Sequence, residues 1–385
     1  MRTPAHGQSG ARAHVVLLRG WSVAPWDLRP HERLADDYRI TVLVPRRNLY
    51  ATAGIDVERR RALTLSDVLP PGPLGRLATR ALGERFLRLA AQLRDADIVH
   101  VAELGNWYSA QAARLKDRLG FRLVVTAWET LPLLDAYRNV RTRPYARAVI
   151  GAADTFLPAT ERARDALLLE GARADDVVTC PPGIDVERFA AARVAAPPRD
   201  GSHLILSVGR LVWEKGHQDL LRALALLRSR GRSDVRALIV GDGPEHARLQ
   251  ALVSDLALSE LVELRSSVRY DEMPALYAQA SCLVLASLPV RFWEEQFGMV
   301  LAEAMAGHVP IVASSSGAIP EVVGDDALLF APGDWVGLAD ALQHGPLARA
   351  PAQRTPVGEE RLGRFSAASA AERLRTVYAE LLARP

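Results

Sequence analysis

Apolar and polar positions divide the chain into short apolar runs that alternate with stretches of helical periodicity. In the second half, the runs predict strands at Leu204–Val208, Ala237–Val240, Val262–Leu264, Cys282–Ala286, Ile311–Ala313 and Leu328–Phe330. In the first half, they predict strands at His14–Leu18, Ile40–Val44, Ile98–Ala102, Arg122–Ala127 and Thr155–Leu157. Residues 45–73 are expected to be irregular, and a helix is expected at Tyr108–Leu119. Strands that alternate with helices at this spacing indicate parallel sheets covered on both faces.

Two such sheets imply two domains. Residues 190–202, AAARVAAPPRDGS, lack periodicity and are rich in Ala, Pro and Gly, which is typical of an interdomain linker. We therefore predict an α/β fold of two Rossmann-like, doubly wound domains, at residues 1–195 and 196–364. A C-terminal helix at about 365–385 is expected to pack back on the first domain. Ligands of such domains bind at the carboxyl ends of the strands.

Composition narrows the classes of protein that fit. The 385 residues carry a formal charge of only +3 with both signs mixed, so we expect no nucleic-acid partner. The two cysteines, Cys180 and Cys282, suit buried reduced thiols better than a disulfide framework. We see no secretory signal and no run of about 20 apolar residues, and therefore expect a cytoplasmic protein.

Two cations follow the first predicted strand of the second half. Arg210 and, five residues later, Lys215 lie in the strand-to-helix loop SVGRLVWEKG. A guanidinium fork and a compact ammonium group can bind a diphosphate and neutralise it as a leaving group without a metal ion. The alternative is a solvated loop in which Glu214 pairs with an arginine. The buried strand before the loop and Gly216 after it favour the diphosphate site.

Two carboxylates flank the break Phe297-Gly298: Glu295 and Glu303 stand eight residues apart. If a helix begins near Gly298, Glu295 lies in the preceding loop and Glu303 lies about one and a half turns inside the helix. Between them, the first N–H groups of the helix offer an anion-binding surface. The alternative is a pair of solvated carboxylates on a surface helix.

A glycine pair, Gly241 and Gly243, follows another predicted strand. The fingerprint G-x-G-x-x-G would need its third glycine at His246, so we interpret the pair as a tight strand-to-helix turn. Glycines at such a turn let a ligand approach the backbone.

Asp95-Ala-Asp97 matches a D-x-D metal motif, but acidic residues between a helix and a strand are common turn formers, so we expect no metal ion. His100 and His308 are interpreted as ordinary polar or core histidines.

Taken together and in order, these motifs resemble the sugar-donor domain of the family 4 retaining glycosyltransferases. The shared motifs are R-x4-K-G from Arg210, G-D-G-P from Gly241, E-x7-E from Glu295, EAMA from Glu303 and G-x-x-P-E from Gly317. The resemblance extends over about 153–332 and implies the GT-B fold, in which two Rossmann-like domains face a central cleft. It also implies a nucleotide-sugar donor, UDP- or GDP-sugar above all, and no cofactor.

The resemblance assigns roles to single residues. Arg210 and Lys215 would bind the diphosphate, Glu303 the ribose hydroxyls and Glu295 the hydroxyls of the sugar. The catalytic group would be Arg210, Lys215 and Glu295, without a covalent bond to Glu295, because such enzymes are thought to react on the front face of the sugar. Backbone contacts to the sugar donor would come from Gly209, Gly241, Gly243, Phe297, Gly298, Met299 and Val300.

The first half departs from the family pattern. Where many members have a histidine at a strand end, VVTAWETLP has Trp128 and Glu129, and Gly20-Trp21 replaces a glycine pair. Indoles stack well on sugar faces, and Glu129 could orient an acceptor hydroxyl, so we place acceptor contacts at these four residues. Alternatively, Trp128 packs the domain interface.

A helical pattern over residues 74–94 has an apolar stripe of Leu74, Leu77, Ala81, Phe86, Leu89 and Leu93, with arginines outside it. Such a basic amphipathic helix could lie on an anionic membrane and give peripheral contact at the inner membrane surface. We favour the alternative, a helix whose apolar stripe covers the domain core.

The expected activity is transfer of a hexose, with retention, from a nucleotide-sugar to a hydroxyl of a small molecule, a glycan or a lipid-linked glycan. The alternatives are a catalytically silent sugar-nucleotide-binding subunit, a phosphorylase and an epimerase on the same fold.

Overall fold

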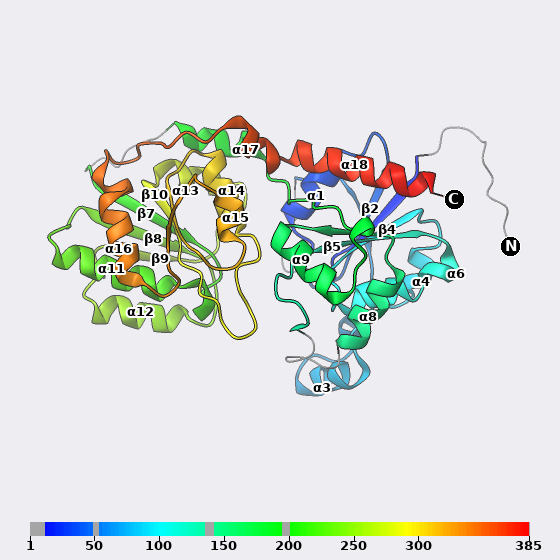
Figure 1. Ribbon diagram of the computed structural model, residues 1–385. Coiled ribbons are helices and arrows are strands. Elements are labelled where there is room, and N and C mark those ends of the chain that lie inside the picture. The colour runs from blue at the N-terminus through cyan, green and yellow to red at the C-terminus, as the bar shows by residue number, and fades with distance from the viewer. Residues whose placement is uncertain (1–11, 49–53, 135–141, 195–200, 385) are drawn as a thin grey trace.

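The computed structural model describes residues 12–48, 54–134, 142–194 and 201–384. In this part of the chain, two six-stranded parallel sheets lie side by side, each with helices on both faces (Figure 1). The architecture of two doubly wound α/β domains is as predicted.

The first sheet has the order β3-β2-β1-β4-β5-β6. Its strands are β1 (His14–Leu18), β2 (Arg39–Val44), β3 (Glu58–Arg61), β4 (Ile98–Ala102), β5 (Arg122–Ala127) and β6 (Thr155–Pro158). All five residues of β1 are buried because helices cover both faces of the sheet, which explains its continuous apolar sequence.

The second sheet has the order β12-β11-β10-β7-β8-β9. Its strands are β7 (His203–Val208), β8 (Val235–Val240), β9 (Val262–Arg265), β10 (Cys282–Leu285), β11 (Ile311–Ser314) and β12 (Leu328–Phe330). In both sheets the first strand of the domain is central.

Helices occupy the connections. Those of the first half are α1 (Pro25–Glu32), α2 (Leu65–Val68), α3 (Pro73–Leu82), α4 (Leu89–Gln92), α5 (Trp107–Ala113), α6 (Lys116–Leu119), α8 (Arg143–Ala152), α9 (Glu161–Glu170) and α10 (Val186–Phe189). Those of the second half are α11 (His217–Ser229), α12 (His246–Asp255), α13 (Met273–Gln279), α14 (Met299–Ala306), α15 (Ile319–Val323), α16 (Trp335–His344), α17 (Glu359–Arg364) and α18 (Ala367–Ala383).

The single helix predicted over residues 74–94 is wrong. α3 ends at Gly83, whose φ is +74°, and the chain returns to the core before α4 begins. Leu74 and Leu77 are 77% and 65% exposed, whereas Phe86 and Leu89 are buried. The stripe therefore belongs to two elements, and α3 projects from the domain (Figure 1) instead of covering its core.

Two further predictions need correction. The helix expected at Tyr108–Leu119 is divided into α5 and α6, and residues 45–73, expected to be irregular, contain β3 and α2. The sequence of β3, ERRR, has no apolar alternation because this edge strand is largely exposed.

The C-terminal helix α18 lies along the first domain (Figure 1). Its buried residues Leu374, Tyr378 and Leu381 share a hydrophobic core with β1 and α1. Residues 195–200 of the predicted linker lie outside the described residues, and the domain limits at 195 and 364 stay a prediction.

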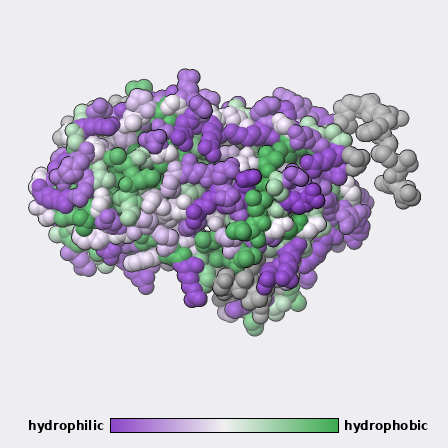
Figure 2. All heavy atoms as spheres, viewed as in Figure 1, coloured by the Kyte–Doolittle hydropathy of each residue, from purple (hydrophilic) through white to green (hydrophobic). Residues whose placement is uncertain are grey.

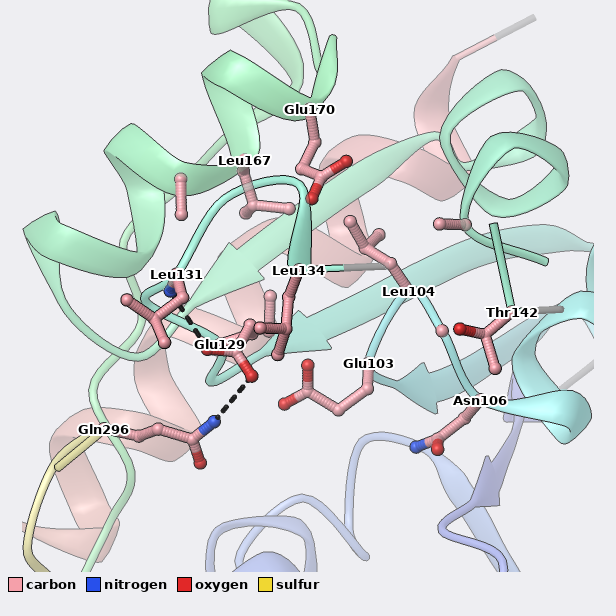
Figure 3. Close-up of a pocket in the computed structure, with 14 residues that line it drawn as sticks. Glu103, Leu104, Asn106, Glu129, Leu131, Leu134, Thr142, Leu167, Glu170 and Gln296 are labelled. Atoms are coloured by element: carbon pink, nitrogen blue, oxygen red, sulfur yellow. Dashed lines mark hydrogen bonds between the residues drawn. The ribbon is translucent and has the colours of Figure 1, made fainter. Parts of the chain in front are cut away.

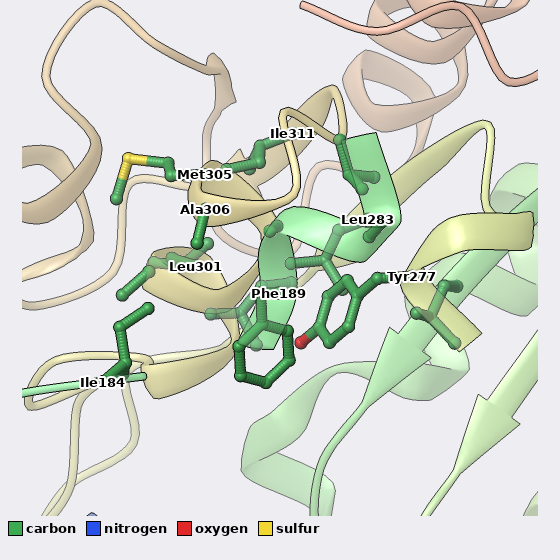
Figure 4. Packing of buried hydrophobic residues seen from close by; sticks show 14 of the residues in the cluster. Ile184, Phe189, Tyr277, Leu283, Leu301, Met305, Ala306 and Ile311 are labelled. Atoms are coloured by element: carbon green, nitrogen blue, oxygen red, sulfur yellow. The ribbon is translucent and has the colours of Figure 1, made fainter. Parts of the chain in front are cut away.

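The core of the second domain surrounds α14. Phe189, Tyr277, Leu283 and Leu301 pack together there (Figure 4). Polar side chains cover much of the visible face of both domains, with smaller apolar areas between them (Figure 2). Within the described residues, we find no helix of sufficient length and hydrophobicity to cross a bilayer.

Candidate active site

The loop after β7 is shaped by a glycine at its end. Gly216 has φ +69°, and a Cβ there would lie 1.8 Å from the carbonyl oxygen of Ala286. Only glycine lets this loop lie so close to the end of β10. The loop therefore delivers Lys215 to the carboxyl end of the neighbouring strand.

At that strand end, Lys215 meets Glu295. The Lys215 Nζ lies 2.7 Å and 3.0 Å from the two carboxylate oxygens of Glu295, and Ser287 Oγ donates to Glu295 Oε2 at 2.5 Å. Lys215 Nζ also lies 4.9 Å from the ring centre of Trp293. Glu295 is only 5% exposed, so a buried ion pair forms the centre of the predicted site.

Arg210 lies in the same loop, but its side chain is 62% exposed, and its nearest carboxylate is Glu214 at 4.0 Å. The surface ion pair considered for this loop is therefore present: it joins Glu214 to Arg210 and does not include Lys215. The side chain of Lys215 is only 15% exposed, so the two cations of this loop differ in their exposure to solvent.

The predicted helix start near Gly298 is confirmed. Gly298 is the N-cap of α14 with φ +78°, and Met299 and Val300 form its first turn. The N–H groups of this turn have no partner within the helix. Phe297, just before the cap, is 2% exposed and anchors the loop in the core.

Glu303 lies one turn further along α14. It accepts a hydrogen bond from Tyr277 Oη at 2.7 Å and is 4% exposed. Burial raises the pKa of Glu303 to about 7. Tyr277 was not identified from the sequence, because only the fold brings α13 beside α14.

The glycine turn after β8 supports the cationic loop. A Cβ on Gly241 would lie 1.9 Å from the oxygen of Gly209, and a Cβ on Gly243 would lie 2.2 Å from the oxygen of Leu211. This turn therefore packs backbone against backbone, which explains both glycines without any ligand.

Across from these groups, the first domain contains a cavity of about 450 Å³ at the carboxyl ends of β4 and β5 (Figure 3). Glu103, Glu129 and Asn106 point into it, and Gln296 of the second domain lines its edge. Gln296 Nε2 donates to Glu129 Oε2 at 3.3 Å. The cavity therefore adjoins the loop that carries Glu295.

Glu103 is a residue that the sequence reasoning missed. It has φ +64°, and its Oε1 accepts a hydrogen bond from Trp128 N at 2.8 Å. Burial is the main reason that the pKa of Glu103 is raised to about 7. The sequence does place Glu103 directly after the apolar run Ile98–Ala102, and this position could have identified it. Polar residues at the ends of parallel strands commonly face a ligand.

The other predicted acceptor residues do not line this cavity. Trp128 contacts Phe297 edge-on, with ring centres 6.1 Å apart, which supports its role in domain packing. Gly20 has φ +55° and lies against Tyr108. Trp21 packs against Trp107 at 5.9 Å and lines a separate cavity beside α3.

The minor motifs have structural partners. Asp97 Oδ2 accepts the backbone N–H of His14, and no cluster of three metal-ligating side chains occurs in the described ranges. His100 is buried between Tyr378 and Thr126. His308 Nδ1 lies 2.8 Å from Val357 N.

Comparison with known proteins gives consistent matches for both halves. The family model "Glycosyltransferase Family 4" matches residues 31–188, and "Glycosyl transferases group 1" matches residues 189–344.

Three individual proteins illustrate the similarity. A 2-deoxystreptamine glucosyltransferase of Streptomyces kanamyceticus is 28% identical over 74% of this chain and 80% of its own. A GDP-mannose-dependent alpha-(1-6)-phosphatidylinositol monomannoside mannosyltransferase of Mycolicibacterium smegmatis is 33% identical over 57% of this chain and 60% of its own. The crystal structure of Anabaena HepE with UDP and glucose is 18% identical, with a TM-score of 0.71 over 96% of this chain and all of that one.

Proposed function

Because the chain belongs to the family 4, group 1 glycosyltransferases and has the GT-B fold, we propose that it transfers a hexose from a UDP- or GDP-sugar to an acceptor hydroxyl with retention of configuration. The observation that carries this proposal is the Lys215–Glu295 pair beside the start of α14. It combines a cation for a diphosphate with a carboxylate for sugar hydroxyls.

The sugar donor binds along the second domain. The exposed Arg210 contacts the diphosphate from the solvent side, and the largely buried Lys215 contacts it from the protein side. The first N–H groups of α14 add an anion-binding surface. The ribose hydroxyls bind Glu303, and the hydroxyls of the sugar bind Glu295. Burial of Lys215 and Glu295 strengthens these contacts.

In the reaction, the bond between the anomeric carbon and the diphosphate oxygen breaks while the acceptor oxygen bonds to the same face. The acceptor proton passes to the departing phosphate. Arg210, Lys215 and the helix terminus stabilise the leaving group, and the proposal includes no metal ion. Glu295 already accepts hydrogen bonds from Lys215 and Ser287, which supports a binding role over a nucleophilic one.

The acceptor binds in the cavity of the first domain, where Glu103 and Glu129 accept hydrogen bonds from its hydroxyl groups. The cavity is lined by carboxylates and short apolar walls, which fits a polyol with one or two rings. Small molecules, glycans and the head groups of lipid-linked glycans meet this description.

The first experiment is a thermal-shift screen of UDP-, GDP- and ADP-sugars, since a bound ligand raises the melting temperature by mass action. Transfer is then measured with the best sugar donor and an acceptor panel that includes 2-deoxystreptamine and phosphatidylinositol monomannoside. Lys215→Ala and Glu295→Ala should each lower turnover by at least about 100-fold. Lys116→Ala, a change at the other lysine of the chain, is the control.

Unchanged turnover in both site variants would contradict the assignment. Binding of the sugar-nucleotide without transfer or hydrolysis would indicate a silent subunit. A requirement for inorganic phosphate would indicate a phosphorylase, and reaction without any acceptor would indicate an epimerase. Activity that survives EDTA is the expected result for a metal-independent site.

A cytoplasmic location with peripheral membrane contact is also part of the proposal. α3 exposes Leu74, Leu77 and Leu82 beside the exposed Arg80, which supports contact with an anionic surface. Co-sedimentation with anionic vesicles, reduced in Leu74→Glu/Leu77→Glu, tests it.

A further inference from the structure

Two glutamates of the second domain bind the start of one helix in the first domain. Glu321 in α15 accepts hydrogen bonds from the backbone N–H groups of Glu161, at 2.8 Å, and Arg162, at 3.2 Å. These N–H groups belong to the first two residues of α9 and have no partner within the helix, and the helix dipole favours a carboxylate there. Glu321 therefore caps α9 across the domain boundary.

The side chain of Arg162 forms the second contact. Its Nε and Nη2 donate to the two carboxylate oxygens of Glu294 at 2.5 Å and 2.9 Å. The side chain of Glu294 is only 8% exposed. A bidentate pair fixes direction as well as distance, so Arg162 determines where the Glu294 carboxylate and its backbone lie.

Both contacts reach the backbone of Glu295. Glu294 directly precedes it, and Gln296, which follows it, donates to Glu129 of the first domain. The carbonyl oxygen of Glu295 accepts from Ala318 N at 2.8 Å, in the turn that leads into α15 and Glu321. The backbone on both sides of Glu295, whose side chain binds Lys215, is therefore linked to contacts with the first domain.

We propose that Arg162 is a positioning residue for the sugar-donor site. Through the Arg162–Glu294 pair and the Glu321 cap, named here the α9 clasp, closure of the two domains fixes the loop that carries Glu295. The catalytic meaning of this inference rests on the proposed function, since Glu295 then binds the transferred sugar.

The clasp explains how the site can depend on closure. If the domains separate, Glu294 loses Arg162 and Glu321 loses the N–H groups of α9, although Glu321 still has Arg364 at 3.5 Å. The backbone on both sides of Glu295 then loses its links to the first domain. The diphosphate groups, which bind Arg210 and Lys215 within the second domain, are less affected. Binding of the nucleotide should therefore precede, and be separable from, assembly of the reactive arrangement.

Arg162→Ala tests the proposal, with Arg164→Ala as the matched control. Arg164 lies on the same helix, but its partner is Glu161 of that helix, at 3.7 Å. In Arg162→Ala, we expect kcat to fall roughly 10- to 100-fold, as for a small misplacement of a reacting group. The Kd for UDP or GDP alone, measured by calorimetry, should stay within about twofold of the wild-type value. The reason is that the substitution does not change Arg210 or Lys215, the residues proposed to bind the diphosphate.

A charge-reversed pair, Arg162→Glu with Glu294→Arg, should recover part of the lost kcat. Unchanged kcat in Arg162→Ala would overturn the proposal. A parallel loss of nucleotide affinity and melting temperature, with no recovery in the reversed pair, would show a merely structural role and overturn it as well.

A measurement without turnover separates this inference from the proposed function. Small-angle X-ray scattering of the full chain should show a larger radius of gyration for Arg162→Ala with Glu321→Gln than for wild type or Arg164→Ala. An unchanged radius would refute the clasp even if sugar transfer is found. A larger radius would support it even if none of the sugar donors tested is used.

Discussion

Burial changes the acid–base chemistry of Glu303. Glu303 is 4% exposed, and its carboxylate accepts a hydrogen bond from Tyr277 Oη. Because the pKa rises from 4.5 to about 7, the folded protein binds more protons than the unfolded chain between these values. Its contribution to stability is therefore present below pH 4.5 and is lost as the pH rises through 7.

Glu303→Gln should remove this slope. At pH 8, we expect the variant to be more stable than wild type by about 1–3 kcal/mol, although it binds the nucleotide less well. Urea unfolding from pH 5 to pH 8 measures the difference. Glu260→Gln, a change at an exposed glutamate, should leave the slope intact, and an equal slope in Glu303→Gln and wild type would contradict the prediction.

Single residues could be predicted where chemistry and local spacing agree. Glu295 in a loop and Glu303 inside the following helix were placed correctly because the helix start at Gly298 is a local property. The partners of these residues could not be predicted. Ser287 and Tyr277 reach them only through the pairing of strands and helices.

At the scale of elements, α3 and α4 show how one amphipathic pattern can belong to two environments. Leu74→Glu should change the free energy of unfolding by less than about 0.5 kcal/mol, since Leu74 is 77% exposed. Leu89→Ala should cost roughly 2–4 kcal/mol, because Leu89 is buried. Urea denaturation compares them, and similar losses in both variants would place α3 in the core.

The error over residues 74–94 has a physical cause. Periodicity reports which side of a helix is apolar but does not say whether that side is covered. Gly83 interrupts the pattern with a positive φ, and a single glycine within a helical pattern does not by itself predict a break. By contrast, strands such as β1 and β10 were predicted because burial on both faces leaves a continuous apolar run.

At the scale of the molecule, α18 stabilises the first domain through Tyr378. Its buried hydroxyl lies 3.0 Å from His31 Nε2 and 2.6 Å from His100 Nδ1. Tyr378→Phe should cost about 1–3 kcal/mol, because both imidazoles lose a buried partner. Calorimetry should show the loss in the unfolding of the first domain.

Tyr145→Phe is the control, since no hydrogen bond of the Tyr145 hydroxyl occurs among the described residues. Equal melting temperatures for Tyr378→Phe and wild type would contradict the prediction.

The arrangement of two α/β domains followed from the alternation of strands and helices. The contacts between them did not, because pairs such as Arg162 with Glu294 join residues 132 positions apart. Such pairs depend on how two finished domains meet, which no local pattern encodes.

The return of α18 to the first domain also bears on synthesis. The core that includes Val15 and Leu17 of β1 is completed by Leu374, Val377, Tyr378 and Leu381 of α18. It therefore joins residues that precede the second domain in the chain to residues that follow it. On the ribosome, the second domain has all of its strands before the first domain receives its last helix. The first domain, whose strands are synthesised before those of the second, should therefore complete its folding after the second domain.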